Sequence, residues 1–497
     1  MIKRYIALLL SAALITAVFS GCSGKINTPV IKKQKVETTA QSKVDTSSFR
    51  LSYSMADSLD PYETETLNNQ VIQTLVYDSL FILDENYEAV PSVAESYVYT
   101  SPEKLVVKLK TGLKFSDGSN IAAENIEYSF IKAKESPHWA STLSIFSRIE
   151  VESAYEVTFH LNSPDPEAHK LLTFAIARMK PNKQGFKIGS GRYKFTEAEG
   201  SVALVKNEYY SDFNPKFAKI NLVNITSNES IENAINIGNI SYAYLDLSEG
   251  SKTKILSASK TVNLNNLVYI GIYCKNGITE NKNIRRAINL AVNRDALVKS
   301  AYRGYATPAK SIFNPVTSLS KKTQIFETTS DLNAAKQAIE ASGYSRDRLK
   351  LTLLTDKSEG KKATANLVKQ QLEAAGFTVN LRVMSSAGYK EYVRDGYYDI
   401  YIGETKLKGD MSLYGFFSSD GATHHGIDTD SKTAKSYRAY MRGKKEIGSF
   451  ILKFTQEMPF VPLLYRQGMI CYTKSLQGDM QGYDGNYFSN IEDWYYN

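Results

Sequence analysis

The sequence predicts an α/β fold. Helix-period and strand-period segments alternate along the chain from Phe49 onward, and clusters of Gly, Pro, Asn and Asp separate them. One stretch reads as a complete β-α-β unit. The length of 497 residues predicts two or three domains. The sequence has no short internal repeat, so a solenoid or a propeller is not expected.

The β-α-β unit lies between residues 331 and 383. In order, it consists of a helix over 331–342 that ends at Gly343, a strand over 350–355, a helix over 361–375 that ends at Gly376, and a strand over 377–383. Glycine is the residue that a helix C-terminus favours, and a helix between two strands is the crossover of a parallel sheet. We therefore expect residues 270–465 to form an α/β lobe, in which ligands bind at the carboxyl ends of strands.

The other elements are predicted from their hydrophobic period. Further helices are expected over 69–80, 122–134 and 283–302, and further strands over 104–109, 156–161, 202–206, 268–273 and 469–472. Three arginines, Arg285, Arg286 and Arg294, fall on the expected helix 283–302. On an amphipathic helix we expect them to be solvated or salt-bridged.

The beginning of the chain has the pattern of an export signal. Two basic residues precede an apolar stretch from Ile6 to Phe19, which at 14 residues is shorter than the ~20 needed to span a bilayer. The ending Ser20-Gly21-Cys22 resembles the bacterial lipobox, in which the cysteine is acylated and becomes the new N-terminus. We expect a signal peptide over 1–21 and a lipoprotein whose acyl groups, such as palmitate, sit on Cys22. An ordinary signal peptide with an incidental cysteine is the alternative.

Composition agrees with a protein that works outside the cytoplasm. Residues 22–48 are rich in Lys, Thr, Ser and Gln and contain no aromatic residue, which predicts a flexible linker. Cys274 and Cys471 are the other two cysteines, and the sequence leaves open whether they pair. The net charge of +8 comes without an Arg-rich tract, so nucleic acid is not expected as a partner. A monomer is expected.

Motifs of catalytic chemistry are absent from the sequence. It contains no HExxH, GxSxG, P-loop, GxGxxG or CxxC pattern, so an enzyme is not expected and no cofactor is predicted. His424-His425 is the only local cluster with metal-ligand potential. Adjacent residues of a strand point to opposite faces, so both rings could bind one ion only from an irregular loop. The alternative is two solvated loop imidazoles.

Several separated segments resemble one known family. They are Ser58–Tyr62 (SLDPY), Val76–Phe81 (VYDSLF), Pro91–Ser96 (PSVAES), Lys114–Gly118 (KFSDG), Ala122–Phe130 (AAENIEYSF), Gly189–Tyr193 (GSGRY), Lys206–Tyr210 (KNEYY), Asn283–Arg294 (NIRRAINLAVNR) and Met458–Leu463 (MPFVPL). In this order they resemble the extracellular solute-binding proteins of family 5, which include oligopeptide- and nickel-binding receptors of ABC importers. The resemblance covers nearly everything after Leu51.

The resemblance implies a periplasmic-binding-protein type II-like fold, in which three discontinuous domains form two lobes about a hinge. Carried onto this sequence, lobe 1 (domain I) takes residues 49–82, 186–269 and 466–497, an inserted domain II takes 83–185, and lobe 2 (domain III) takes 270–465. A ligand would be held in a central cleft by hinge closure without a covalent step, and the closed form would dock on an ABC permease.

Peptide-binding relatives hold the ligand's α-amine with an Asp in a segment resembling W-x-x-D-Y-x-D-P. After Tyr398-Asp399 this sequence lacks both the tryptophan and the Asp-Pro pair. Asp410 matches the anchoring Asp with a shift of two residues, and Glu404 is a second candidate. A buried carboxylate suits an ammonium because it forms a charge-assisted hydrogen bond. A surface or helix-capping role is the alternative for each.

Three tyrosines, Tyr62, Tyr401 and Tyr414, lie in segments that face the cleft in relatives, and tyrosine offers both apolar area and a hydroxyl. The leading hypothesis is a receptor for short peptides, tethered to the extracytoplasmic face of a cell membrane, with a Gram-positive-type envelope favoured. A receptor for nickel or another metal chelate is the second hypothesis, because of His424-His425. A surface hydrolase or interaction lipoprotein that uses Glu404 or Asp410 is the third.

Overall fold

The computed structural model describes residues 48–198, 200–247 and 253–496. The predicted signal peptide, Cys22 and all of the predicted linker except Ser48 lie outside the described residues, so they stay predictions. Within the described part of the chain, no helix is both long enough and apolar enough to cross a membrane.

Most described strands join one sheet of eleven strands, in the order β15-β14-β16-β12-β17-β11-β1-β10-β9-β8 with β13 beside β17. The strands are β1 (Phe49–Tyr53), β8 (Tyr193–Ala198), β9 (Ser201–Lys206), β10 (Lys219–Asn224), β11 (Tyr242–Leu245), β12 (Ala258–Ile272), β13 (Ala306–Pro308), β14 (Lys350–Asp356), β15 (Thr378–Met384), β16 (Ile400–Lys406) and β17 (Phe460–Tyr472). Because β14 runs parallel to β15 and β16 while the central pairs are antiparallel, the sheet is mixed. The predicted α/β class is confirmed.

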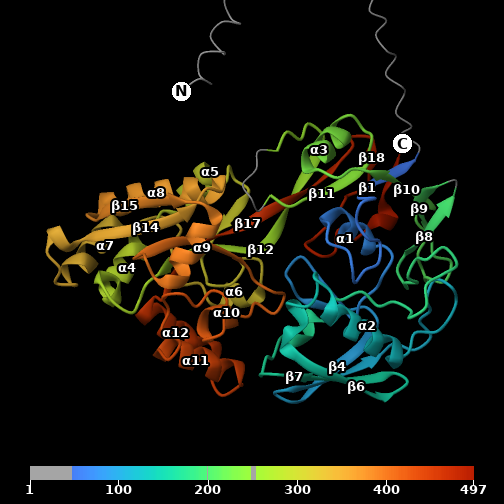
Figure 1. The fold of residues 1–497 in the computed structure, drawn as a ribbon, viewed down its shortest axis with the longest axis horizontal. Helices are drawn as coiled ribbons and strands as arrows, with labels where there is room; N and C mark the ends of the chain where they lie inside the picture. The colour runs from blue at the N-terminus through green and yellow to red at the C-terminus, as the bar shows by residue number, and fades with distance from the viewer. Residues whose placement is uncertain (1–47, 199, 248–252, 497) are drawn as a thin grey trace, which may run out of the picture. The chain divides into compact units, whose positions relative to one another are not determined.

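Two long antiparallel strands, β12 and β17, take part in both large hydrophobic cores (Figure 1). On β12, Leu264 belongs to one core and Leu267 to the other. On β17 the change occurs between Tyr465 and Ile470. The chain therefore crosses between two separately packed bodies at two neighbouring points, which is the structure of a hinge. We call residues 267–465 the second lobe and the body around the other core the first lobe.

Asparagine side chains fill the hinge. The pairing of β12 with β17 slips between Asn263 and Leu267, which leaves the backbone of 264–266 off that ladder. Asn314 donates to the Asn265 side-chain oxygen at 2.7 Å and to Leu264 O at 3.0 Å. Side-chain amides thus replace missing ladder bonds, and a buried backbone group needs such a partner.

The first lobe carries an inserted domain, built from an antiparallel sheet in the order β4-β5-β7-β6 and one long helix. Its elements are β4 (Ala94–Ser101), β5 (Lys104–Leu109), α2 (Ala123–Glu135), β6 (Phe146–Ser153) and β7 (Glu156–Leu161). Alternate residues of β5, such as Leu105 and Val107, are fully buried, because one face of the sheet packs on α2. The predicted strands 104–109 and 156–161 coincide with β5 and β7.

Smaller elements complete the first lobe. They are α1 (Leu67–Gln73), β2 (Phe81–Leu83), β3 (Ala89–Pro91), α3 (Asn228–Asn236), β18 (Leu476–Gln477) and β19 (Tyr495–Tyr496). The predicted helix 69–80 is wrong beyond Gln73. There the chain leaves the helix because Val76 O accepts a bond from Gly191 N at 2.9 Å and Leu75 O accepts one from Tyr193 N at 2.8 Å.

The second lobe is rich in helices. They are α4 (Lys282–Ala291), α5 (Arg294–Ala301), α6 (Ser318–Lys322), α7 (Leu332–Glu340), α8 (Glu359–Ala375), α9 (Ser386–Asp395), α10 (Tyr414–Phe417), α11 (Lys432–Met441) and α12 (Ile447–Glu457). The β-α-β unit appears as predicted, and Gly376 ends α8 with φ of 114°. The single helix expected over 283–302 is two helices, because the Asn293 side chain accepts from Ala296 N and starts α5 afresh.

Two of the three arginines on these helices are buried, which contradicts the expectation of solvated or salt-bridged side chains. Arg285 donates to the carbonyls of Thr279, Glu280 and Glu457 at 2.6 to 2.9 Å. Arg294, 1% exposed, is also held by protein acceptors. Only Arg286 is exposed. Backbone carbonyl oxygens thus accept hydrogen bonds from both buried guanidinium groups, in place of the expected salt bridges to carboxylates.

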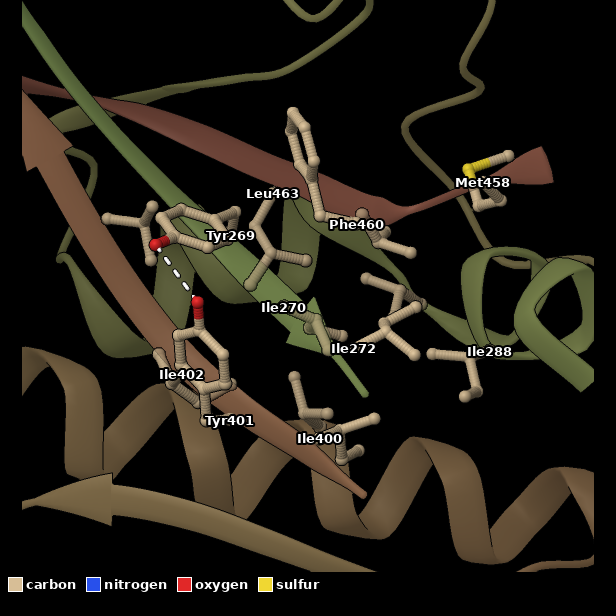
Figure 2. Close-up of a cluster of buried hydrophobic side chains, with 14 of the residues drawn as sticks. Tyr269, Ile270, Ile272, Ile288, Ile400, Tyr401, Ile402, Met458, Phe460 and Leu463 are labelled. Carbon is tan, nitrogen blue, oxygen red and sulfur yellow. Dashed lines mark hydrogen bonds between the residues drawn. The ribbon is translucent and has the colours of Figure 1, made fainter. Parts of the chain in front are cut away.

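A pair of tyrosines lies across a pair of glycines between β12 and β16 (Figure 2). Tyr401 is paired with Gly271, and Tyr269 with Gly403, so each ring lies over a residue without a side chain. The two hydroxyls are 3.4 Å apart. The tight fit depends on glycine, because a Cβ at position 271 would lie 2.1 Å from the Tyr401 ring.

The two cysteines of the described chain are not paired. Cys274 is half-buried in the second lobe, whereas Cys471 is buried in a small core with Ile231 and Ile235 of α3. The question left open by the sequence is therefore answered in favour of free thiols.

Candidate functional site

A cavity of about 350 Å³ lies between the core of the first lobe and its inserted domain. Aromatic side chains supply much of its wall, and several ionisable groups converge on it, as is usual in ligand pockets. Its lining includes Tyr77, Asp78, Phe81, His138, Trp139, Ala175, Arg192, Tyr210, Phe213, Asp484, Tyr487 and Glu492. These residues come from six separate stretches of the chain.

Local structure explains how the cavity wall forms. After α1 ends at Gln73, the chain runs as an irregular segment to β2, and this segment carries Tyr77 and Asp78. The Tyr77 hydroxyl donates to Lys187 O at 3.2 Å, which fixes its ring. Trp139 projects from the loop after α2, where its ring packs edge-on against His138 at 4.4 Å between centroids.

The charged groups of the cavity include both signs. Arg192 lies 3.7 Å from the Glu492 carboxylate and donates to Ser489 O at 3.4 Å. Burial raises the pKa of Asp78, although the neighbouring Ser190 and Arg192 oppose this. A ligand with one positive and one negative group could therefore find a partner for each.

The second lobe contacts a wall residue of the cavity through Lys406, which lies at the end of β16 and does not itself line the cavity. Its Nζ atom lies 3.0 Å from Asp484 Oδ2, and Asp484 lines the cavity. Asp484 also accepts a bond from the Tyr87 hydroxyl at 3.3 Å, and that hydroxyl bonds the hinge carbonyl of Asn263 at 3.0 Å. One carboxylate thus connects the cavity, the hinge and the other lobe.

Two other hollows differ from the cavity in their lining or their volume. A groove of about 970 Å³ lies wholly on the second lobe, between α4 and α12. Within the part of the chain that the structure describes, no aromatic side chain lines this groove, whereas aromatic side chains supply much of the wall of the cavity. A hollow of about 170 Å³ beside the hinge, lined by Asp84 and Glu85, has half the volume of the cavity.

Tyr62, predicted to face the cleft, supports the cavity from behind. It is buried, and its hydroxyl donates at 3.0 Å to the carbonyl oxygen of Ala175, a residue of the cavity wall. Burial raises its pKa, so the hydroxyl stays protonated and can donate. The structure therefore places Tyr62 one layer behind the surface that a ligand would touch.

Tyr401 and Tyr414, the other two predicted tyrosines, lie away from the cavity. Tyr401 is 3% exposed in the core of the second lobe, and burial raises its pKa to about 12. Tyr414 is 47% exposed on α10, and its hydroxyl donates to the Asp420 carboxylate at 2.8 Å. Neither residue lines the cavity.

Glu404 lies at the hinge. It accepts from the Asn266 side chain at 3.1 Å, and Arg466 approaches its second oxygen at 3.8 Å. Burial raises the pKa of Glu404, and Arg466 opposes that effect. Its charge is thus already matched by protein groups from β12 and β17. The role of Glu404 as an amine anchor stays a prediction.

Asp410 is buried where the second lobe meets the inserted domain, beside Asp165. It accepts a bond from Ser412 N at 2.9 Å. The structure does not bring Asp410 together with Glu404, whose hydrogen-bond partner comes from β12. Its role as an amine anchor also stays a prediction. As a catalytic carboxylate it would lack substrate access in this arrangement, because it is 6% exposed.

The two adjacent histidines lie in a loop of the second lobe. The ring centroids of His424 and His425 are 5.1 Å apart, and His424 Nδ1 bonds the carbonyl of Gly421. Among the described residues, no group of three or more potential metal-ligating side chains occurs. A metal held there would need ligands from elsewhere, such as a chelating molecule.

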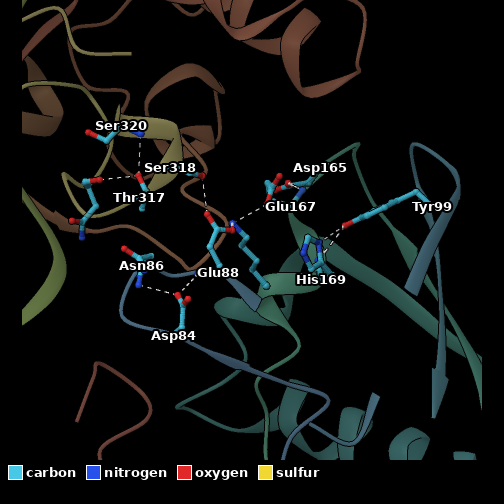
Figure 3. Close-up of polar contacts among 12 residues, drawn as sticks. Asp84, Asn86, Glu88, Tyr99, Asp165, Glu167, His169, Thr317, Ser318 and Ser320 are labelled. Carbon is cyan, nitrogen blue, oxygen red and sulfur yellow. Dashed lines mark hydrogen bonds and ion pairs between the residues drawn. The ribbon is translucent and has the colours of Figure 1, made fainter. Parts of the chain in front are cut away.

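Polar contacts join the inserted domain to the second lobe (Figure 3). Glu88 accepts from Lys170 at 2.7 Å and from the Ser318 hydroxyl, at the start of α6, at 2.8 Å. Lys408 donates to Ser141 O at 2.5 Å. The lobes are therefore in direct contact beyond the two hinge strands.

The sequence offered few signals for the cavity residues. Trp139 is one of two tryptophans and follows His138 in a loop, a local oddity that could have marked it. Asp484 begins a turn, Asp-Gly-Asn-Tyr, near the C-terminus. Asp78 and Arg192 stand within Val76–Phe81 and Gly189–Tyr193, two segments that carry the family resemblance and predict no ligand contact by themselves.

Comparisons with known proteins agree with this architecture. The model of the family described as bacterial extracellular solute-binding proteins, family 5 middle, matches residues 88–424. The glutathione-binding protein GsiB of Salmonella paratyphi A (strain ATCC 9150 / SARB42) is 24% identical over 468 residues, which cover 84% of this chain and 89% of GsiB.

Two solved structures show the same fold at low identity. The murein tripeptide binding protein MppA, in an unliganded open form, superposes with a TM-score of 0.75 at 17% identity, over 90% of this chain and 97% of MppA. NikA from Brucella suis, in complex with Fe(III)-EDTA, superposes with a TM-score of 0.67 at 18% identity, over 90% of this chain and 100% of NikA. At such identities the likeness shows the fold alone.

Proposed function

The chain belongs to the bacterial extracellular solute-binding proteins of family 5, and we propose that it captures short peptides for an ABC importer. The peptide would occupy the cavity of the first lobe, and the second lobe would close over it. The observation that carries the proposal is the cavity itself, which has aromatic walls, charges of both signs and a contact to the other lobe through Lys406.

The size of the cavity favours a small solute. At ~30 Å³ per water, 350 Å³ corresponds to about a dozen waters, which suits a di- or tripeptide better than a long chain. Arg192 suits a terminal carboxylate, and Asp484 suits an ammonium. GsiB is named for glutathione and MppA for a murein tripeptide, and both names agree with a peptide of this size.

Closure would bring the two lobes together without a covalent step. The free energy for it comes from contacts made only when the lobes meet, because such contacts distinguish closed from open. Lys406 makes one such contact with Asp484 at the cavity. The β12 and β17 strands would bend at the slip near Asn263, where ladder pairing is already broken. The closed form would then dock on the permease.

The assignment is tested by ligand screening of the purified protein. Among di- and tripeptides, at least one is expected to raise the melting temperature, because saturation at 100 times Kd stabilises by ~2.7 kcal/mol. Trp139→Ala is expected to weaken the best peptide at least about tenfold, as loss of a buried aromatic contact does. Isothermal titration calorimetry measures both affinities.

A matched control for that variant is Tyr155→Ala, which removes an exposed aromatic residue from the same domain, away from the cavity. It is expected to bind like the wild type. The peptide proposal fails if no peptide stabilises the protein, or if Trp139→Ala binds as tightly as the control.

A metal chelate is the second candidate, favoured by the two neighbouring imidazoles of His424 and His425. The same screen therefore includes Ni(II) alone and Ni(II) with free histidine. The assignment would pass to this candidate if the chelate stabilises the protein and no peptide does. Replacing both histidines with alanine should then abolish the stabilisation by the chelate.

We also propose that Cys22 anchors the protein to the extracytoplasmic face of the membrane, with residues 22–48 as a tether that keeps the receptor near its permease. Several acyl chains on one cysteine bind a membrane stably, whereas one chain binds marginally. Cys22→Ala is expected to release the protein into the medium or the periplasm, as fractionation and immunoblotting would show. Retention of the variant in the membrane fraction would contradict the anchor.

A further inference from the structure

A pair of buried carboxyl groups lies where the inserted domain meets the second lobe. Asp165 follows β7, Asp410 follows β16, and the two residues are 1% and 6% exposed. One oxygen of each carboxyl group accepts a hydrogen bond from a backbone amide. Glu167 N donates to Asp165 Oδ1 at 2.8 Å, and Ser412 N donates to Asp410 Oδ1 at 2.9 Å. The other Asp165 oxygen receives no donor within the described chain, and the Asp165 side chain is within hydrogen-bonding reach of Asp410.

Two ionised carboxylates offer only acceptors to each other, so a hydrogen bond between them requires a proton on one. We propose that Asp165 and Asp410 share one proton, and that this proton fastens the inserted domain to the second lobe, so that closure is favoured in acid and weakened as the pH rises. The device goes beyond solute capture, because it acts on the lobes whichever solute is bound.

The charges around the pair agree with a single shared proton. Lys408 is the cation that acts on both carboxyl groups, and its ammonium can balance one carboxylate. A second ionised carboxylate in the same buried place would be uncompensated, which is costly. The other ionisable groups nearby are Glu167, which pairs with Lys170 at 3.0 Å, and the tyrosines Tyr437 and Tyr440.

Those neighbours do not supply a competing titration near neutral pH. Burial raises the pKa of Tyr437 well above its ordinary value and that of Tyr440 to about 12, so both stay neutral. Lys170 is held by Glu88 as well as Glu167, and its pKa is raised by them in spite of burial. Burial lowers the pKa of Lys408, although Asp410 and Asp165 oppose this, so Lys408 titrates together with the carboxyl pair as one cluster.

The sign of the pH dependence follows from the direction of the shifts. Burial raises the pKa of both carboxyl groups in the closed form, and the Asp410 charge raises that of Asp165 further. An exposed Asp of the open form titrates near ~3.9. Between that value and the raised pKa the closed form binds the extra proton. The ratio of closed to open protein then falls by up to about tenfold per pH unit as the pH rises through this window.

Neighbouring bonds between the same two bodies do not depend on this proton. Ser318 donates to Glu88, and Lys408 donates to the carbonyl of Ser141. These bonds determine the ratio of closed to open protein at high pH. At low pH the shared proton of the carboxyl pair raises that ratio further. The geometry thus describes a graded closure rather than an all-or-none lock.

Small-angle scattering of the ligand-free protein tests the proposal. The wild-type radius of gyration is expected to increase as the pH is raised from ~4 through the raised pKa of the pair. Asp410→Asn is expected to stay compact throughout, because a carboxamide donates to Asp165 without a titrating proton. Asp347→Asn, which removes an exposed carboxyl of the same lobe, is expected to follow the wild type. The proposal is overturned if the wild type shows no expansion, or if Asp410→Asn expands like it.

A measurement on the wild type guards against a variant that does not fold. Infrared difference spectra are expected to show the band of a protonated carboxyl above pH ~4, where exposed aspartates have ionised, and this band disappears over the pH range in which the scattering changes. The absence of such a band below the pH at which the scattering changes would also overturn the proposal. No ligand enters either experiment, so a failure of peptide binding leaves this test unaffected, and the reverse also holds.

Discussion

Gly271→Ala is expected to destabilise the second lobe by about 3 kcal/mol, the upper range for overpacking a well-filled core. The added methyl would lie 2.1 Å from the ring of Tyr401, which has no room to retreat. Tyr401 packs at 5.0 Å from Tyr398 and at 5.9 Å from Tyr269, measured between ring centroids. Urea unfolding followed by circular dichroism measures the loss as a lower midpoint.

Gly448→Ala is the matched control, because nothing lies within 4 Å of a methyl at that position on helix α12 of the same lobe. It is expected to leave stability unchanged or to raise it by up to about 1 kcal/mol, since alanine is the better helix former. Combining Gly271→Ala with Tyr401→Leu should recover part of the loss, because the smaller side chain frees space. Equal midpoints for the two glycine variants would refute the packing account.

The family resemblance predicts Tyr401 at the ligand cleft from the segment in which it lies, whereas its side chain is buried in the core of the second lobe. A strand sends alternate residues to opposite faces, so Tyr401 and Glu404 of β16 point in different directions. Position along the chain cannot tell which face is the cleft. Gly271 opposite Tyr401 leaves the space that the buried ring fills, yet that pairing is visible only once the register of β12 and β16 is known.

Secondary structure was predictable where local pattern and tertiary packing agree. Strand β5 and helix α8 follow their own hydrophobic period, and Gly376 closes α8 as expected. The helix expected to continue through Val76 ends early, because glycine-rich backbone at Gly189 and Gly191 packs against it. That close approach joins segments more than 100 residues apart, as a local reading cannot foresee.

The candidate site was harder to predict because its parts come from distant segments. Asp78, Arg192 and Asp484 converge on one cavity from three separate segments of the chain. Asp165 and Asp410 belong to different bodies, and each taken singly reads as an ordinary loop aspartate. A cleft of this kind is a property of how domains meet, which composition and periodicity do not encode.

Arg294→Met is expected to cost about 3 kcal/mol of unfolding free energy. The guanidinium donates to Pro462 O at 2.9 Å, to Glu327 O at 3.1 Å and to the Asn289 side-chain oxygen at 2.6 Å. Methionine fills a similar volume but leaves these three acceptors without that donor, at ~1 kcal/mol or more each. Burial lowers the pKa of Arg294 to about 10, so it is still charged at neutral pH.

Arg286→Met makes the same chemical change at an exposed position on the preceding helix. Its free energy of unfolding should therefore stay within about 0.5 kcal/mol of the wild-type value. Arg294→Lys should lose most of the stability too, because one ammonium cannot reach acceptors spread around a planar fork. Equal midpoints for Arg294→Met and Arg286→Met would refute this account. Because Pro462 belongs to β17, Arg294 ties helix α5 to a strand that crosses the hinge. A lobe that moves as one body needs such ties, so the same variant should also reduce the cooperativity of unfolding.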